Sequence, residues 1–245
     1  MKVVVAGKGG VGKTMVSGTL ARLLARSGRR VVGLDADTNP MLGVSLGLGP
    51  EETELLVGVR QGLDTGETEH ERSTAGFLER FGREAPDGVR LVVASRIERP
   101  DPGCPCCGVS PESLLREIEA ADAVVIGDLE AGIGTVLRLR DGDADVVVVV
   151  VQPTAKSIEV ARRAIPVAKA KAELVVVVAN RVRDDEDVRL IRDALGEPEL
   201  LIVPDDEAVA EADREGRAPI DVDAGSPAVL AVAALAERLA AVPVA

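Results

Sequence analysis

The opening segment constrains the fold of this chain most strongly, because a strand pattern passes through a glycine-rich loop into a helix pattern. Residues 2–6 read KVVVA, which is typical of a buried strand. Residues 7–14 read GKGGVGKT, and the apolar spacing of a helix runs through 13–27. Four glycines in the loop permit positive φ angles and keep side chains away from the backbone amides. This order predicts the first unit of a parallel α/β sheet, with a loop that can curl around an anion.

The same loop carries the spacing G-x-x-x-x-G-K-T between Gly7 and Thr14, which is typical of polyphosphate binding. The loop amides and the positive end of the following helix are expected to face the phosphates. We expect Lys13 to neutralise the β and γ oxygens and the Thr14 hydroxyl to ligate Mg²⁺. The nucleotide contacts predicted in this segment are Gly7, Lys8, Gly9, Gly10, Val11, Gly12, Lys13, Thr14 and Met15. A glycine-rich turn without a ligand is the alternative, but the strand–loop–helix context favours phosphate binding.

Short apolar runs alternate with helical patterns along the rest of the chain. Strands are predicted at 2–6, 30–34, 89–94, 123–127, 145–151, 173–179 and 199–203, and helices at 13–27, 111–120, 154–171, 184–195, 205–215 and 226–241. This alternation predicts an α/β fold, a doubly wound, mostly parallel sheet of seven to eight strands with helices on both faces. Residues 146–151 are six consecutive valines, typical of a central strand covered on both faces. We expect one domain over 1–245, with an irregular surface insertion at 49–88 that contains short helices.

The composition limits the classes of partner. Hydrophobic residues make up 46% of the chain and aromatic residues only 1%, so Val, Ala, Leu and Ile must fill the core. The chain has 29 basic and 41 acidic residues and a formal net charge of −12. This balance disfavours nucleic acid, whose binding depends on neutralising phosphates, and it disfavours anionic membranes. The chain enters a strand directly and has no apolar stretch long enough to span a bilayer, so we expect a cytoplasmic protein without a signal peptide.

Polar side chains follow further strands of the predicted sheet, where the carboxyl ends of parallel strands border the ligand crevice. Asp37 is placed to orient the attacking water or to sense the γ-phosphate through Mg²⁺, and Asp128 is placed to hold a metal-bound water. The amide of Asn180 suits the edge of a purine ring. Three residues at the end of the last strand are expected to close over the base: Pro204, Asp205 and Asp206. Acidic turns and loop caps use the same residue types, so these assignments depend on the loop at 7–14.

These motifs give the chain a resemblance, over nearly its whole length, to the deviant Walker A ATPases, which have the P-loop NTPase fold. That class includes nitrogenase iron proteins, cell-division and plasmid-partition ATPases, and nickel-insertion ATPases. The resemblance implies an enzyme that hydrolyses ATP to ADP and phosphate and that forms a homodimer on ATP binding. It implies that Lys8 is the signature lysine that reaches the nucleotide of the partner subunit. It also implies catalytic roles for Lys13, Asp37 and Asp128, with Thr14 and the two aspartates around magnesium, and an adenine contact by Asn180.

Three stretches narrow the resemblance to the CooC-type accessory ATPases of carbon monoxide dehydrogenase. They are 33–43 with 46–48, reading GLDADTNPMLG and LGL, 103–106 with 111–116, reading GCPC and PESLLR, and 128–133, reading DLEAGI. In that family a C-x-C pair lies at the dimer interface and binds a metal ion. The resemblance therefore implies a nucleotide-dependent homodimeric metallochaperone that assists nickel insertion into a client metalloenzyme, carbon monoxide dehydrogenase.

All three cysteines of the chain lie within four residues, at Cys104, Cys106 and Cys107. Two thiolates per chain supply half of a tetrahedral site, and a two-fold axis through the site would complete it from a second subunit. Ligand type leaves Ni²⁺ and Zn²⁺ open. Cys107 and residues 108–110 depart from the family pattern, so a Cys104/Cys107 pair or a third thiol ligand also stays open. Cysteines without a metal role are the remaining alternative.

Other functions share parts of this pattern. An iron-protein-like reductase component needs a second cysteine shortly after Asp128, and residues 131–140 contain none. An iron–sulfur cluster carrier or scaffold ATPase also uses paired cysteines at a dimer interface, but past the position of Asp128 rather than before it. A positioning or partition ATPase would need a basic face or a basic amphipathic helix, which the net charge of −12 disfavours. The cluster carrier is therefore the main alternative.

Overall fold

We describe the chain from a computed structural model at residues 1–62, 74–94, 115–118, 123–196 and 199–241. In these ranges eight strands form one sheet in the order β3-β4-β2-β5-β1-β6-β7-β8. The strands are β1 (Lys2–Gly7), β2 (Arg30–Ala36), β3 (Gly82–Glu84), β4 (Arg90–Val93), β5 (Ala123–Leu129), β6 (Val146–Val151), β7 (Leu174–Val182) and β8 (Leu200–Pro204). All neighbours pair in parallel except β3 and β4, which are antiparallel. The predicted doubly wound, mostly parallel sheet is therefore confirmed, with eight strands.

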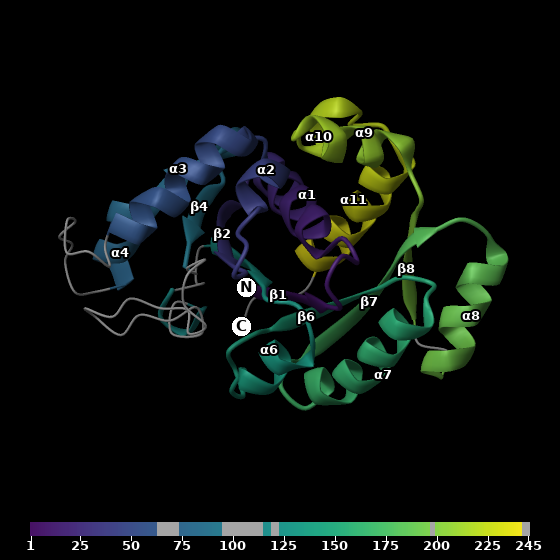
Figure 1. Ribbon diagram of the computed structural model, residues 1–245. Coiled ribbons are helices and arrows are strands. Elements are labelled where there is room, and N and C mark those ends of the chain that lie inside the picture. Colours follow the sequence, from purple (N-terminus) through teal and green to yellow (C-terminus); the bar gives the residue numbers. More distant parts are fainter. Residues whose placement is uncertain (63–73, 95–114, 119–122, 197–198, 242–245) are drawn as a thin grey trace.

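Helices cover both faces of this sheet (Figure 1). The helices are α1 (Lys13–Arg26), α2 (Leu42–Leu46), α3 (Gly49–Gly62), α4 (Thr74–Phe81), α6 (Ile133–Arg138), α7 (Ala155–Lys169), α8 (Asp185–Leu195), α9 (Glu207–Glu215), α10 (Pro219–Val222) and α11 (Pro227–Ala240), with a 3₁₀ turn η1 (Pro86–Gly88). The buried side chains of α1, α2 and α11 pack on one face, and those of α6, α7 and α8 pack on the other. Within the ranges given above, no helix has the length and apolar character needed to cross a bilayer.

The valines of β6 contribute to both layers of the core. Val146, Val148 and Val150 pack in the layer of α1 and α11, whereas the alternate residues Val147, Val149 and Val151 pack in the layer of α7. All six side chains are buried, and β6 lies between β1 and β7 in the sheet. A strand covered on both faces needs apolar side chains at successive positions, which explains why the valine run occupies this interior place.

Residues 49–88, which were expected to form an irregular insertion with short helices, contain helices and also an edge strand where they are described. α3 opens the segment, and α4 leads into β3, the antiparallel edge strand. Phe81, the last residue of α4, is buried in the same core layer as Val92 of β4. Short helices and an edge strand with few apolar positions give a weak periodic signal, so tertiary packing decided their structure.

The segments before and after β5 are short where they are described. Of the helix predicted at 111–120, residues 115–117 are helical, and residues 111–114 and 119–120 lie outside the described residues. After β5, Gly132 is the N-cap of α6 and Gly134 belongs to the first turn of this helix. The connection between β5 and α6 is therefore short.

The order of the strands identifies the edge where a ligand would bind. β1 lies between β5 and β6 in the sheet. Strands β2 to β5 lie on one side of β1, and strands β6 to β8 lie on the other side. In open α/β sheets, ligands bind outside the carboxyl ends of the strands where such connections diverge. The glycine-rich loop between β1 and α1 lies at this edge.

Candidate nucleotide-binding site

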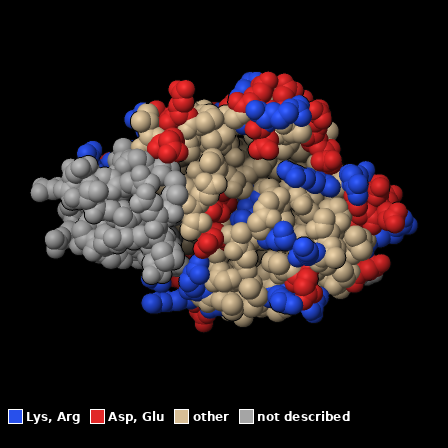
Figure 2. Space-filling model, viewed as in Figure 1, with Lys and Arg blue, Asp and Glu red and all other residues tan. Residues whose placement is uncertain are grey.

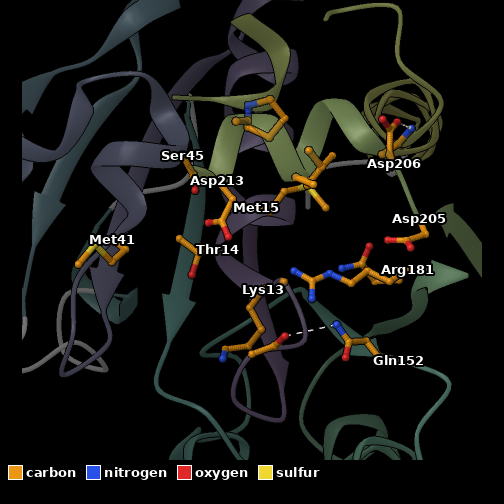
Figure 3. Close-up of a pocket in the computed structure, with 18 of the residues that line it drawn as sticks. Lys13, Thr14, Met15, Met41, Ser45, Gln152, Arg181, Asp205, Asp206 and Asp213 are labelled. Atoms are coloured by element: carbon orange, nitrogen blue, oxygen red, sulfur yellow. Dashed lines mark hydrogen bonds between the residues drawn. The ribbon is translucent and has the colours of Figure 1, made fainter. Parts of the chain in front are cut away.

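A cavity of about 1250 Å³ lies at the carboxyl edge of the sheet and is lined by residues far apart in the sequence (Figure 3). Eleven of the predicted site residues line it: Gly9, Gly10, Gly12, Lys13, Thr14, Met15, Asp37, Asn180, Pro204, Asp205 and Asp206. In the close-up view, Lys13 and Thr14 lie toward one side, and Asp205 and Asp206 lie toward the other (Figure 3). The cavity thus places the glycine-rich loop opposite the residues predicted to surround a base.

The loop between β1 and α1 has glycine where another residue would not fit. Gly7 has a φ of 149°, and a Cβ atom added there would lie 2.4 Å from the Val150 carbonyl oxygen. Gly12, with a φ of 91°, is the N-cap of α1 and supplies no side-chain acceptor to the helix. The first amides of α1 are therefore available to an external anion, as in a phosphate cradle.

Two side chains from the neighbouring strands hold this loop. The Asn180 amide nitrogen donates to the Val11 carbonyl at 2.7 Å, and the Asn180 side chain is buried. The Gln152 amide nitrogen donates to the Gly10 carbonyl at 3.3 Å, the bond drawn in Figure 3. Sequence reasoning did not single out Gln152, although its place directly after the valine strand marks it as an edge residue. The loop is thus supported from β6 and β7 by the protein itself.

Two buried aspartates lie side by side at the carboxyl ends of β2 and β5. Asp35 and Asp128 are partners in the register of these neighbouring strands. Burial raises the pKa of Asp35 well above its ordinary value, and the adjacent Asp128 charge raises it further. Burial raises the pKa of Asp128 to about 6, even though a hydrogen bond from Thr14 and the charge of Lys13 lower it. A divalent cation beside this pair would relieve the repulsion between the two carboxylates.

The two carboxylate oxygens of Asp128 differ in their surroundings. The Ser17 hydroxyl lies 3.2 Å from Oδ1 and donates a hydrogen bond to it. Oδ2 is buried and has no hydrogen-bond partner among the described residues. An unpaired buried carboxylate oxygen is unfavourable, and a metal-bound water would supply the missing donor. This oxygen, with the Thr14 hydroxyl nearby, therefore fits a Mg²⁺ site of the kind expected from the sequence.

Asp35 shapes the segment that carries Asp37. Its carboxylate accepts hydrogen bonds from the Leu42 amide at 2.7 Å and from the Asp37 amide at 3.3 Å. Asp37 itself lines the cavity and accepts a hydrogen bond from the Asn39 amide at 3.0 Å. Asp35 therefore ties the end of β2 to the start of α2 and determines the path of the chain between them. The sequence predicted a chemical role for Asp37 at this strand end, and no sequence signal distinguished Asp35.

Asp206 has a structural task at the opposite side of the cavity. Its two oxygens accept hydrogen bonds from the Ala208 amide at 2.9 Å and from the Ala228 amide at 2.8 Å. It therefore caps α9 and joins this helix to α11. The sequence predicted a base contact for Asp206. In the structure, both of its carboxylate oxygens accept hydrogen bonds from backbone amides in the wall of the cavity.

Arg181 is a residue of the cavity that the sequence analysis missed. It follows Asn180 at an irregularity in the β7–β8 pairing and has a φ of 56°. A residue other than glycine in this region carries a backbone cost, so the surrounding structure must impose it. The side chain reaches from β7 into the cavity (Figure 3). Among the described residues its guanidinium has no ion-pair partner, which leaves a cation available to a bound ligand.

The charges of this cavity contrast with the surface around it. In the space-filling view, acidic side chains gather over α8, α9 and α10 (Figure 2). The cavity lining has a small excess of positive charge within a chain whose net charge is −12: its five basic residues are Lys13, Arg181, Arg183, Arg214 and Arg217, and its four acidic residues are Asp37, Asp205, Asp206 and Asp213. A polyanion would therefore be attracted to the cavity rather than to the surrounding surface.

The remaining predicted site residues lie beside the cavity or outside the described residues. Lys8 is half-buried, its ammonium lies 3.4 Å from the Gly9 carbonyl oxygen, and it is not part of the lining of its own chain's cavity. Gly7, Val11 and Asp128 lie behind the lining. The cysteines fall within 95–114, outside the described residues: Cys104, Cys106 and Cys107. The predicted metal site at these thiols stays a prediction.

Comparison with known proteins agrees with this geometry. The model of the CobQ/CobB/MinD/ParA nucleotide binding domain matches residues 2–220. The chain is 33% identical over 242 residues to an uncharacterized ATP-binding protein of Methanocaldococcus jannaschii, covering 91% of this chain and 92% of that protein. It is 30% identical over 261 residues to the carbon monoxide dehydrogenase accessory protein CooC of Rhodospirillum rubrum, covering 98% and 97%. The septum site-determining protein MinD of Pyrococcus horikoshii, solved as a complex with Mg-ADP, has the same fold, with a TM-score of 0.69 at 20% identity over 97% and 94% of the two chains.

Proposed function

This chain belongs to the CobQ/CobB/MinD/ParA nucleotide-binding domain family, and we propose that it is a homodimeric metallochaperone that couples ATP hydrolysis to nickel insertion into carbon monoxide dehydrogenase. ATP hydrolysis is the activity of the MinD and ParA members of this family. The observation that carries the proposal is the 30% identity to CooC over nearly the full length of both proteins. In this proposal, ATP is hydrolysed in the nucleotide cavity and the metal is bound by cysteines.

The cavity and the residues behind it would supply the groups that hydrolysis of ATP requires. Bound Mg²⁺ supplies positive charge to the β- and γ-phosphate oxygens. Thr14 would hold the ion directly and Asp128 through a water, which matches the unpaired Oδ2 of Asp128. Lys13 lies at the start of α1 and would offset charge that develops on the leaving phosphate. Asp37 lines the cavity and is partly exposed, so it can orient the attacking water.

A second copy of the chain completes each site in this proposal. Lys8 belongs to the phosphate-binding loop, yet it does not line the cavity of its own chain. Its ammonium has a long contact to the Gly9 carbonyl at 3.4 Å, which is a weak hold for a charged group. These two observations support the role that the resemblance implies, in which Lys8 reaches the nucleotide of the partner subunit.

The metal would be the cargo of this dimer. Cys104 and Cys106 from each of two subunits would give four thiolates around one ion, which is a complete tetrahedral set. Because the same two-fold closure would assemble both the nucleotide sites and the metal site, ATP binding and hydrolysis would control capture and release of the metal. The client enzyme then receives the ion when the dimer opens.

Metal binding by the purified dimer tests the proposal directly. We expect about one Ni²⁺ or Zn²⁺ per dimer, measured by elemental analysis after gel filtration with ATP and without it. The double variant Cys104→Ser with Cys106→Ser should lose the metal, because two remaining thiols from the Cys107 pair cannot close a four-ligand site. The single variant Cys107→Ser is the matched control and should retain the metal.

Two outcomes would change the assignment. Loss of metal in Cys107→Ser would replace the ligand pair with one that includes Cys107 but would leave the metallochaperone proposal standing. A brown protein with an iron–sulfur absorption band and no bound nickel would contradict nickel insertion and favour the cluster carrier.

A further inference from the structure

Ser17 lies inside α1, one turn after Lys13, and its side chain is completely buried. Its hydroxyl oxygen lies 2.9 Å from the Lys13 carbonyl oxygen and 3.2 Å from Oδ1 of Asp128. Ser17 does not line the nucleotide cavity. Any part that it plays in the chemistry must therefore pass through another residue.

The contact with Lys13 needs no functional explanation, but the contact with Asp128 does. A serine inside a helix commonly bonds to the carbonyl four residues earlier, as Ser17 does with Lys13. Asp128 is 111 residues away in the sequence and reaches Ser17 only because β5 lies beside β1 and carries it under α1. The hydroxyl has one proton to donate, and a carboxylate is the stronger of the two acceptors.

The effect of this bond is to make the two oxygens of Asp128 unequal. A carboxylate can rotate about its last side-chain bond with little resistance, so its oxygens exchange places unless one of them is held. Ser17 holds Oδ1, and Thr14 also hydrogen-bonds to this carboxylate, whereas Oδ2 is the buried side-chain oxygen left without a partner in the described parts of the chain. The orientation of the open oxygen is thus determined by α1, the helix that also carries Lys13 and Thr14.

We propose that Ser17 is a positioning residue of the magnesium site, which holds Oδ1 of Asp128 so that Oδ2 stays turned toward the metal-bound water. The inference deepens the proposed function and rests on it, because it takes Mg²⁺-nucleotide as the ligand of the cavity. It assigns the orientation of Asp128 to a hydroxyl that the phosphate-binding spacing does not include.

Equilibrium binding of a fluorescent ADP analogue at a series of Mg²⁺ concentrations tests this inference without turnover. In Ser17→Ala, we expect the gain in ADP affinity on adding Mg²⁺ to fall about tenfold relative to the wild type, as for the loss of a hydrogen bond to a charged group. Affinity measured in EDTA should be unchanged, since the phosphate loop and Lys13 are intact. Alanine is a good helix former, so the variant should retain the fold, which circular dichroism would verify.

Thr19→Val is the matched control, because it also removes a completely buried hydroxyl from α1. The Thr19 hydroxyl contacts the Met15 sulfur at 3.9 Å and has no contact with Asp128. This variant should keep the Mg²⁺ dependence of the wild type. Ser17→Thr retains a hydroxyl and should restore most of the Mg²⁺ effect lost in Ser17→Ala.

A double-mutant cycle with Asp128→Asn separates positioning from a general structural role. If Ser17 acts through Asp128, adding Ser17→Ala to Asp128→Asn should cause no further loss of the Mg²⁺ effect. Wild-type Mg²⁺ dependence in Ser17→Ala, or an equal loss in Thr19→Val, would overturn the inference and leave the proposed function intact. If the ADP affinity of the wild type did not depend on the Mg²⁺ concentration, this result would instead contradict the magnesium site of the proposed function.

Discussion

Asn180 uses the two ends of one amide group for different purposes. Its nitrogen donates to the Val11 carbonyl at 2.7 Å and so holds the phosphate loop against β7. Its oxygen remains as an acceptor in the lining of the cavity, where an adenine amino group offers a donor and a guanine carbonyl does not. If this oxygen contacts the base, one residue links the choice of base to the shape of the phosphate site.

This division of the amide predicts a preference for adenine nucleotides. We expect fluorescent ADP to bind at least about tenfold more tightly than the corresponding GDP analogue, because the acceptor would face an unpaired carbonyl in the guanine complex. Competition titrations with unlabelled ADP and GDP measure the ratio, and the shared phosphates serve as the internal control. Equal affinity for the two nucleotides would show that Asn180 only supports the loop.

Sequence spacing identified some residues of the candidate site but not others. The loop residues, Asp37 and Asn180 could be proposed from sequence because each follows a strand at a predictable edge. Asp35 and Ser17 could not, because a polar residue near the end of a strand or inside a helix can occur for many reasons. Their roles depend on contacts with Leu42 and Asp128, which sequence spacing does not reveal.

Among the secondary-structure elements, α1 is joined to two distant segments through Arg22. The Arg22 side chain is 4% exposed and pairs with Asp87 of η1 at 2.6 Å and with Asp221 of α10 at 2.5 Å. The helix that carries Lys13 and Thr14 is thus held at its far end by charges from both sides. Removing the buried cation would leave two carboxylates near one another without their partner.

The Arg22 network predicts a pH-dependent contribution to stability. Burial alone would raise the pKa of Asp87, but hydrogen bonds from Arg22 and then from Arg26 hold it below its ordinary value. A carboxyl group with a lowered pKa in the folded state stabilises the fold above its unfolded pKa, about 3.9, and this stabilisation is lost as the pH falls through the folded value. Arg22→Met should therefore lower the free energy of unfolding by about 2 kcal/mol at neutral pH and by less below about pH 4.

Urea unfolding of the wild type and of Arg22→Met at both pH values measures this difference. Arg26→Met is the comparison variant, because Arg26 contacts the same Asp87 oxygen at 2.9 Å but its side chain is 39% exposed. It should cost less than about 1 kcal/mol, as expected for a solvated ion pair. A loss in Arg22→Met that stays constant with pH would assign the effect to packing rather than to charge.

At the scale of the whole molecule, the proposed dimer depends on contacts between two chains around the nucleotide. Lys8 carries the prediction, since it belongs to the phosphate loop but is not part of the cavity lining in its own chain. With ATP and Mg²⁺, light scattering after gel filtration should show a dimer for the wild type and a monomer for Lys8→Ala. Binding of ADP by each subunit should change little in this variant, because the other loop contacts are retained.

Lys13→Ala is the contrasting variant for this experiment. It should lose nucleotide binding and dimerisation together, because Lys13 lines the cavity of its own chain. If Lys8→Ala weakened ADP binding as strongly as Lys13→Ala, Lys8 would act within its own subunit, and the proposed cross-subunit contact would be wrong.

The sequence alone was sufficient for the features that depend on local chemistry. Glycine at 7–12 anticipated the phosphate loop, because backbone angles and close approach there depend on the residue itself. The valines at 146–151 anticipated an interior strand, because burial on both faces requires continuous apolar residues. The alternation of strand and helix patterns likewise anticipated the parallel sheet.

Only the tertiary structure decided which residues meet. Strand order brings β2, β5 and β1 together, so Asp35 lies beside Asp128, and Ser17 reaches Asp128 across 111 residues of sequence. The same is true of the edge strand β3 and the Arg22 network. The spacing of apolar residues predicts which face of a helix or strand is buried, but it does not predict which other element packs against that face. The phosphate loop could therefore be found in the sequence, whereas the contacts of Asp128, the proposed magnesium ligand, emerged from the fold.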